Sequence, residues 1–147
     1  MIDTGLVVRE AYMSALDGNI VVDSANIPVY DMVPDDESYP YVVLWNQEES
    51  GGDVLTRTKD NKNASELFVT LRIVTGFQNG IKHGGKKLAD QIAAEVLSLL
   101  LGGTYLTFDG LENVSQVLDS TTYEQTRTDS HIIIVKEIVI NHLLSQS

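Results

Sequence analysis

The sequence predicts an α+β fold in which a largely antiparallel or mixed β-sheet carries two main helices on one face. Two segments, 4–17 and 86–103, place apolar residues at helical spacing. Several runs with strand character lie between and after them, which gives the order helix, several strands, helix and two closing strands. Helices grouped against a largely antiparallel sheet are typical of the α+β layer architecture.

The chain has 147 residues, the size of one domain, so we expect a single α+β domain over residues 1–147. It has no Cys, which excludes disulfide bonds and thiolate chemistry. Its first residues have neither the basic region nor the uninterrupted apolar core of a signal peptide. No apolar run approaches the ~20 residues needed to cross a bilayer. We therefore expect a soluble cytoplasmic protein.

The net charge of −11 is unevenly distributed along the chain. Residues 1–50 hold ten acidic residues and one basic residue, Arg9, whereas residues 51–100 hold five acidic and seven basic residues. Tight binding to nucleic acid is disfavoured, because phosphate contacts need clustered Lys and Arg. Two interpretations remain open: the acidic residues form an ordinary solvated surface, or they provide electrostatic complementarity between copies of the chain.

The first predicted helix spans residues 4–17. Asp3 and Thr4 are favourable N-cap residues, and Gly18 provides the stop. The apolar residues at helical spacing in this segment are Leu6, Val7, Met13 and Leu16. Short extended pieces are expected at 19–23 and 27–33, and Pro28 excludes the second piece from a central position in a sheet at that point.

An acidic elbow separates these pieces from the next strand. Pro34 and Pro40 fix the backbone at its two ends, and the residues between them favour turns. The elbow should fix the direction of the apolar run Val42–Leu44 that follows it. The continuity of this run is typical of a strand that is covered on both faces.

Residues 48–65 form a long polar segment, which we expect to be a mobile loop or an extended hairpin. Gly51 and Gly52 loosen it, and three basic residues make it locally positive. A polar connection this long in a compact domain is usually functional or disordered. The candidate contacts with a partner or a neighbouring subunit are these basic residues and the acidic residues of the elbow: Arg57, Lys59, Lys62, Asp35, Asp36 and Glu37.

The second half of the chain supplies most of the predicted core. In the segment 66–77 apolar residues alternate with a period of two, and we expect Leu67, Val69, Leu71 and Ile73 to face the helices. The helix 86–103 presents an apolar stripe of Leu88, Ile92, Val96, Leu99 and Leu100 and ends at Gly102 and Gly103. A short extended piece at 105–108 precedes two strands, 114–127 and 131–144. The last is strongly β-branched and should be central or heavily covered.

No motif nominates catalytic, cofactor-binding or metal-binding residues, so we do not expect an enzyme. His83, His131 and His142 match no metal-ligand spacing, and the last two are expected to border a strand. The glycines and lysines of 76–87 lack the spacing of a phosphate-binding P-loop. The consecutive acids of 35–37 lack the spacing of an EF-hand, and there is no G-x-S-x-G elbow.

The organisation of the chain resembles the tail terminator, or tail-completion, proteins of long-tailed bacteriophages. The stretch VYDMVPDDESYPYVVLW carries the resemblance, because that family often has a Tyr-Asp-x-Val-Pro-like stretch, a few turn residues and then Pro-Tyr-Val-Val-Leu. The matching residues are Tyr30, Asp31, Val33 and Pro34, followed by residues 40–44. The helix before this stretch, and the alternating strand, helix and two closing strands after it, follow the family's order. Where the family often has a small residue after Val-Val-Leu, this chain has Trp45 and Asn46.

The resemblance implies a non-enzymatic structural protein without a cofactor. It would form a ring, most simply a hexamer, that caps the tail tube and then presents the surface that joins the head. Its partners would be copies of itself, the tail tube protein and a head-tail connector protein, with DNA passing through the channel without specific binding. It would be located at the head-proximal end of the virion tail, and in the cytoplasm of the infected bacterium during assembly.

The residues themselves agree with this implication, because a channel that passes DNA should repel phosphate. A head-to-tail ring also needs two different complementary patches on each subunit. Two alternatives remain: another head-tail connector or stopper ring, and a cytoplasmic ligand-binding α+β domain whose pocket is gated by the 48–65 segment.

Overall fold

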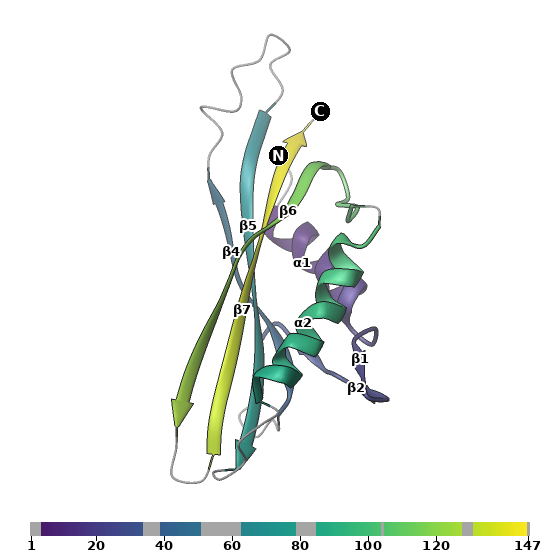
Figure 1. Ribbon diagram of the computed structural model, residues 1–147. Helices are drawn as coiled ribbons and strands as arrows, with labels where there is room; N and C mark the ends of the chain where they lie inside the picture. Colours follow the sequence, from purple (N-terminus) through teal and green to yellow (C-terminus); the bar gives the residue numbers. More distant parts are fainter. Residues whose placement is uncertain are drawn as a thin grey trace.

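The computed structural model describes residues 4–33, 39–50, 63–78, 85–103, 105–127 and 131–146. Two helices lie on one side of an elongated sheet of long strands (Figure 1). The helices are α1 (Thr4–Leu16) and α2 (Gly85–Leu101). The strands are β1 (Val21–Val22), β2 (Ala25–Asn26), β3 (Val29–Tyr30), β4 (Tyr41–Ser50), β5 (Asn63–Gln78), β6 (Glu112–Arg127) and β7 (His131–Gln146). This arrangement confirms the predicted α+β fold with both helices on one face.

The main sheet has five strands in the order β3-β4-β5-β7-β6. All neighbouring pairs are antiparallel except β3 and β4, which are parallel. A separate hairpin, β1–β2, was not anticipated as two strands. Its turn residues Asp23 and Ser24 both have positive φ, at 51° and 67°, as a two-residue type I′ turn requires.

Pro28 has the effect that the sequence predicts. It lies directly before β3, which is an edge strand and pairs with β4 only at Val42 and Val43. The carbonyl of Pro28 accepts a hydrogen bond from the Val42 N–H at 2.9 Å, so the ring takes no donor position in the ladder. β6 forms the opposite edge of the same sheet.

One apolar core lies between the helices and the sheet. The side of β5 that was expected to face the helices does so, because Leu67, Val69, Leu71 and Ile73 are all buried there. Ile92 and Val96 of α2 are fully buried in the same cluster, and Leu88 packs against it half-buried. The expected core is thus confirmed.

The helical stripes differ in detail from the predicted ones. In α1 the buried residues are Val8, Tyr12 and Leu16, spaced by four, whereas Leu6 is 52% exposed. Val7 and Met13 are half-buried at the margin of this stripe. In α2 the buried stripe includes Ala89 and Ala93, and Leu99 lies at its edge with 37% exposure. Small Ala residues occupy the centre of this stripe, which allows α2 to approach the sheet closely.

The run Val42–Leu44 is covered on both faces, as its continuous apolar character predicts. Val42 and Leu44 belong to the core under the helices, and Val43 on the opposite face is 4% exposed. Aromatic rings contribute at this end of β4: Tyr39 stacks on Tyr41 with a centroid distance of 5.7 Å, and Tyr41 meets Tyr30 edge-on at 6.1 Å. A side chain on Gly76 of β5 would overlap the Tyr39 ring, so glycine is needed there.

The strands are longer than the sequence pattern indicates. β4 and β5 pair from Tyr41 with Val74 to Ser50 with Glu66, so residues 48–50 and 63–65 at the ends of the polar segment are strand residues. β7 lies between β5 and β6, as its β-branched composition predicts, and it extends two residues past the predicted end at 144. His142 therefore lies inside a strand and not at its border, whereas His131 is the first residue of β7. Within the described residues, neither helix is long and apolar enough to cross a membrane.

Leu71 provides a direct test of this core. Leu71→Ala is expected to lower the free energy of unfolding by about 2–5 kcal/mol, because it removes a buried side chain at the centre of the sheet. Leu6→Ala is the matched control: the same truncation at a residue that is 52% exposed should change the value by no more than about 0.5 kcal/mol. Denaturant unfolding measures both. A loss below about 0.5 kcal/mol for Leu71→Ala would show that the strand faces are reversed.

Candidate functional site

The six residues that the sequence nominates as contacts lie outside the described residues. Asp35, Asp36 and Glu37 fall in the gap between β3 and β4, and Arg57, Lys59 and Lys62 fall in the gap between β4 and β5. The described part of the chain has other polar clusters, two of them on its surface and one inside it.

The internal cluster is a chain of hydrogen bonds centred on His142 of β7. The Tyr12 hydroxyl of α1 bonds to Nε2 of His142, and Nδ1 of His142 lies 3.1 Å from Oδ1 of Asn113. Nδ2 of Asn113 donates to Oε1 of Gln116 at 2.8 Å and to the Leu106 carbonyl at 3.1 Å. Gln116 in turn donates to the carbonyl of Leu100, near the end of α2. This polar network therefore links both helices to β6 and β7.

The direction of these bonds defines the protonation of His142. Oδ1 of Asn113 is an acceptor, so Nδ1 of His142 carries the hydrogen and Nε2 accepts from the Tyr12 hydroxyl. Burial lowers the pKa of His142 to about 4 and raises that of Tyr12 far above its usual value. The imidazole is therefore neutral at physiological pH. Because His142 and Tyr12 are at most 1% exposed, the network is placed to hold the fold together and not to meet a substrate.

The first surface cluster lies on the face of the sheet opposite α1 and α2. The pairing of β4 with β5 shifts register between Leu44 and Asn46, which leaves Trp45 as the extra residue of a β-bulge. Its side chain is 55% exposed, and the guanidinium of Arg72 lies 3.9 Å from the ring centroid. Nε of Arg72 also contacts Oε2 of Glu137 at 3.0 Å, which fixes the guanidinium over the indole. Trp45 is thus exposed but held in one orientation.

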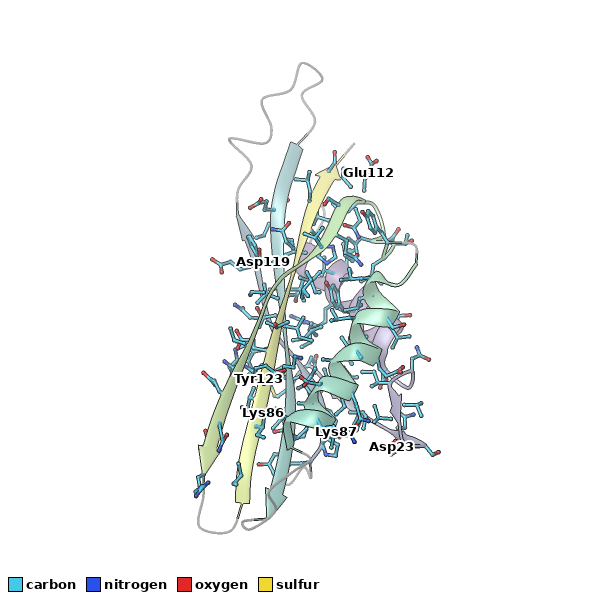
Figure 2. All side chains as sticks on the ribbon, viewed as in Figure 1. Asp23, Lys86, Lys87, Glu112, Asp119 and Tyr123 are labelled. Carbon is cyan, nitrogen blue, oxygen red and sulfur yellow. The ribbon has the colours of Figure 1, made fainter. Side chains whose placement is uncertain are left out.

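The second surface cluster joins the start of α2 to β6 and β7. Nζ of Lys136 lies 2.7 Å from Oδ1 of Asp90 and 3.0 Å from the Tyr123 hydroxyl, which also donates to Asp90. Figure 2 shows Tyr123 and Lys86 close together at this end of the molecule, and Nζ of Lys86 lies 5.8 Å from the Tyr123 ring.

The charges of this second cluster reinforce one another. Hydrogen bonds from Lys136 and Tyr123 lower the pKa of Asp90. Burial pushes the pKa of Lys136 down, but its hydrogen bonds to Asp90 and Tyr123 outweigh that effect and raise it. The ion pair is therefore fully charged at neutral pH and braces the exposed end of β6 against α2.

Two surface depressions lie near the β3–β4 edge. One, of about 480 Å³, is lined by Arg9, Asp31, Met32, Leu44, Trp45, Asn46 and Gln47. The other, of about 400 Å³, lies between the β1–β2 hairpin, Pro40 and Leu88 of α2. Among the described residues of the 48–65 segment, none lines either depression. In the described ranges no group of three or more His, Asp or Glu side chains is placed to hold a metal ion.

The fold has a counterpart among solved structures. It matches a chain from the virion of a native gene transfer agent particle with a TM-score of 0.59 and 17% sequence identity. The match covers 80% of this chain and 78% of that chain, so the likeness extends over most of both chains. No family model matches the sequence, and no curated protein matches it significantly. At this level of identity the likeness shows a shared fold.

The sequence contains a pattern that indicates the internal cluster around His142, although the sequence analysis did not predict it. His142 stands at period-two spacing with Ile138, Ile140 and Leu144, all of which face the core. That spacing places His142 on the buried face of its strand, where an imidazole needs polar partners. The Trp45 cluster had no comparable signal, because the bulge that exposes Trp45 is set by pairing with a strand distant in sequence.

The neutral imidazole predicts a defined pH dependence of stability. The unfolded chain binds a proton at His142 near the ordinary pKa of 6.5, whereas the folded chain does so only near about 4. The contribution is fully present above pH 6.5 and declines, by about 3 kcal/mol in total, as the pH falls from about 6.5 to about 4. Denaturant unfolding over this range measures the slope.

His142→Gln is the comparison for that experiment, because glutamine keeps a donor and an acceptor but does not titrate. The variant should be less stable at neutral pH, yet its stability should fall less steeply between about pH 6.5 and about pH 5. Parallel slopes in the two proteins would show that His142 is not the group that is buried in its neutral form.

Proposed function

We propose that the protein is a non-enzymatic structural component of a phage-like virion. The observation that carries this proposal is the shared fold with a gene transfer agent virion chain over 80% of the present chain. The described residues are consistent with a structural role, since their most deeply buried polar cluster is closed to solvent and their surface clusters are ion pairs on aromatic rings. A virion component assembles with other structural proteins, so we expect its function to reside in its surfaces.

Within that class we propose a tail terminator: a ring, most simply a hexamer, that caps the tail tube and forms the surface that joins the head. The Tyr-Asp-x-Val-Pro-like stretch followed by Pro-Tyr-Val-Val-Leu supports this assignment, and so does the net charge of −11, which suits a channel that passes DNA. Another head-tail connector or stopper ring is the nearest alternative. The protein would act at the head-proximal end of the tail.

The proposed function predicts a particle of defined mass and activity. Negative-stain electron microscopy of the purified protein should show rings, and native mass spectrometry should show a particle of six times the 16.2 kDa chain mass. Added to tails that lack their terminator, the protein should stop tube growth and permit heads to join. Rings that join heads but leave tube growth unchanged would favour a connector or stopper, and a monomer that binds a small molecule would favour the ligand-binding alternative.

The basic residues of the 48–65 segment remain candidates for docking to an acidic partner surface. Changing Arg57, Lys59 and Lys62 together to Glu should leave the fold intact and slow the joining of tails to heads at least about tenfold, because rim charges act mainly on the rate of encounter. The assay adds the variant to unfinished tails and heads and counts infectious particles over time.

A matched control is the single reversal Lys87→Glu in α2, which changes an exposed lysine elsewhere on the molecule. It should have little effect in the same assay. If the triple variant joins tails and heads at the parental rate, the segment does not act in docking, and the acidic elbow residues Asp35, Asp36 and Glu37 become the remaining sequence-nominated contacts.

A further inference from the structure

The two edges of the main sheet are both open over part of their length. β3 covers β4 only at Val42 and Val43, so no strand of the described chain pairs with the outer side of β4 beyond that point. At the opposite edge, β6 has β7 on one side and no described strand on the other. Figure 1 shows these long edge strands at the margins of the sheet. Open edges present unpaired backbone groups and favour association with another chain.

Exposed apolar side chains gather at these same two edges. Beside β4, Trp45 is 55% exposed and Met32 is 81% exposed, and both line the depression of about 480 Å³. On β6, Val117 is 50% exposed and Leu118 is 41% exposed, next to a second register shift between Leu118 and Ser120. Trp and Met are enriched in the cores of protein interfaces. Each edge therefore combines an apolar group with a break in the strand ladder.

Charged residues of opposite sign, Arg9 and Asp119, lie at the two edges, and Asp31 also lines the depression that contains Arg9. Arg9 of α1 lines the depression that contains Trp45, and it is the one basic residue among the first 50 of the chain. Asp119 is exposed on β6 beside Leu118 (Figure 2). The ion pairs of the described residues are Arg72–Glu137 and Lys136–Asp90, so neither Arg9 nor Asp119 has an ionic partner there. A contact between the two edges would give Arg9 and Asp119 each an ionic partner.

We propose that the β6 edge of one copy docks on the β4 edge of the next copy. Val117 and Leu118 of the first copy pack against Trp45 and Met32 of the second, and Asp119 pairs with Arg9. Because the two patches are different and lie on opposite edges of one sheet, the contact is head-to-tail, and repetition closes it into a ring if the rotation per copy permits. The proposal rests on the ring proposed above and assigns its subunit contact.

Charge exchange tests the contact directly. Arg9→Asp and Asp119→Arg should each raise the concentration required for half-assembly at least about threefold, since each places like charges together. The double variant restores the attraction with the signs exchanged and should assemble near the parental concentration. Lys87→Glu and Glu95→Arg make comparable reversals at exposed positions of α2 and should assemble like the parent. Sedimentation velocity over a concentration series measures the concentration for half-assembly of the parent and of these five variants.

Trp45 provides a second readout, because it is the only tryptophan in the sequence. Its fluorescence emission should shift to shorter wavelength as the parent assembles, when the indole is taken out of water. Trp45→Ala should raise the concentration for half-assembly about tenfold or more, the effect of removing a central aromatic anchor. Circular dichroism confirms that each variant is folded. If a charge-reversal variant does not fold, the neutral substitution at the same position, Arg9→Gln or Asp119→Asn, takes its place.

The outcomes separate this contact from the function on which it rests. Assembly that weakens in both single variants and recovers in the double variant supports the contact. If the parent forms rings and the single variants form them equally well, or if the double variant does not recover, the pairing of these edges is wrong while the ring stands. A parent that remains monomeric at every concentration overturns both the ring and its proposed contact.

Discussion

The hydrogen-bond chain from Tyr12 to Leu100 is the constraint on which the layered structure depends. Apolar packing alone would let two helices slide or rotate on the flat face of a sheet, because hydrophobic attraction is not directional. The Tyr12 hydroxyl, the His142 ring and the Gln116 amide fix α1, β7, β6 and the end of α2 relative to one another. Each donor has an acceptor, and among the described residues no buried side-chain polar atom lacks a partner. One arrangement of the layers therefore satisfies the network, and others leave a polar group unpaired in the core.

Most of the fold could be predicted because its signals are local. The alternation of Leu67, Val69, Leu71 and Ile73, the continuous run Val42–Leu44 and the ring of Pro28 each act within a few residues, and each has the predicted consequence. The errors have a common physical cause. Polar residues at the ends of β4 and β5 become strand residues because the neighbouring strand offers hydrogen bonds, which no local propensity reveals. Leu6 and Leu99 are exposed because packing against the sheet determines which face of each helix is buried.

The surface clusters could not be predicted from sequence pattern either, because they also depend on pairing between residues that are distant in the sequence. Arg72 and Glu137 are 65 residues apart, and Lys136 and Asp90 are 46 apart, so their pairing depends on the register of β5 with β7 and on the position of α2. The residues nominated from the sequence have charge and loop character, and they lie outside the described residues: Asp35, Asp36, Glu37, Arg57, Lys59 and Lys62. The described surface adds an aromatic residue, Trp45, whose exposure follows from a bulge and not from composition.

The bulges in the two edge strands have a consequence for how faithfully the open edges can pair. A regular strand edge accepts a partner in any register that differs by two residues, and long regular edges grow readily into fibrils. The extra residues, one in β4 and two in β6, interrupt the ladder and increase the local twist at fixed points on each edge. A second strand that shifts along such an edge no longer matches the position of the bulge and loses hydrogen bonds there. Each bulge therefore disfavours pairing out of register. An edge that is exposed before assembly is thereby protected from indiscriminate growth while it stays available to a partner of matching shape.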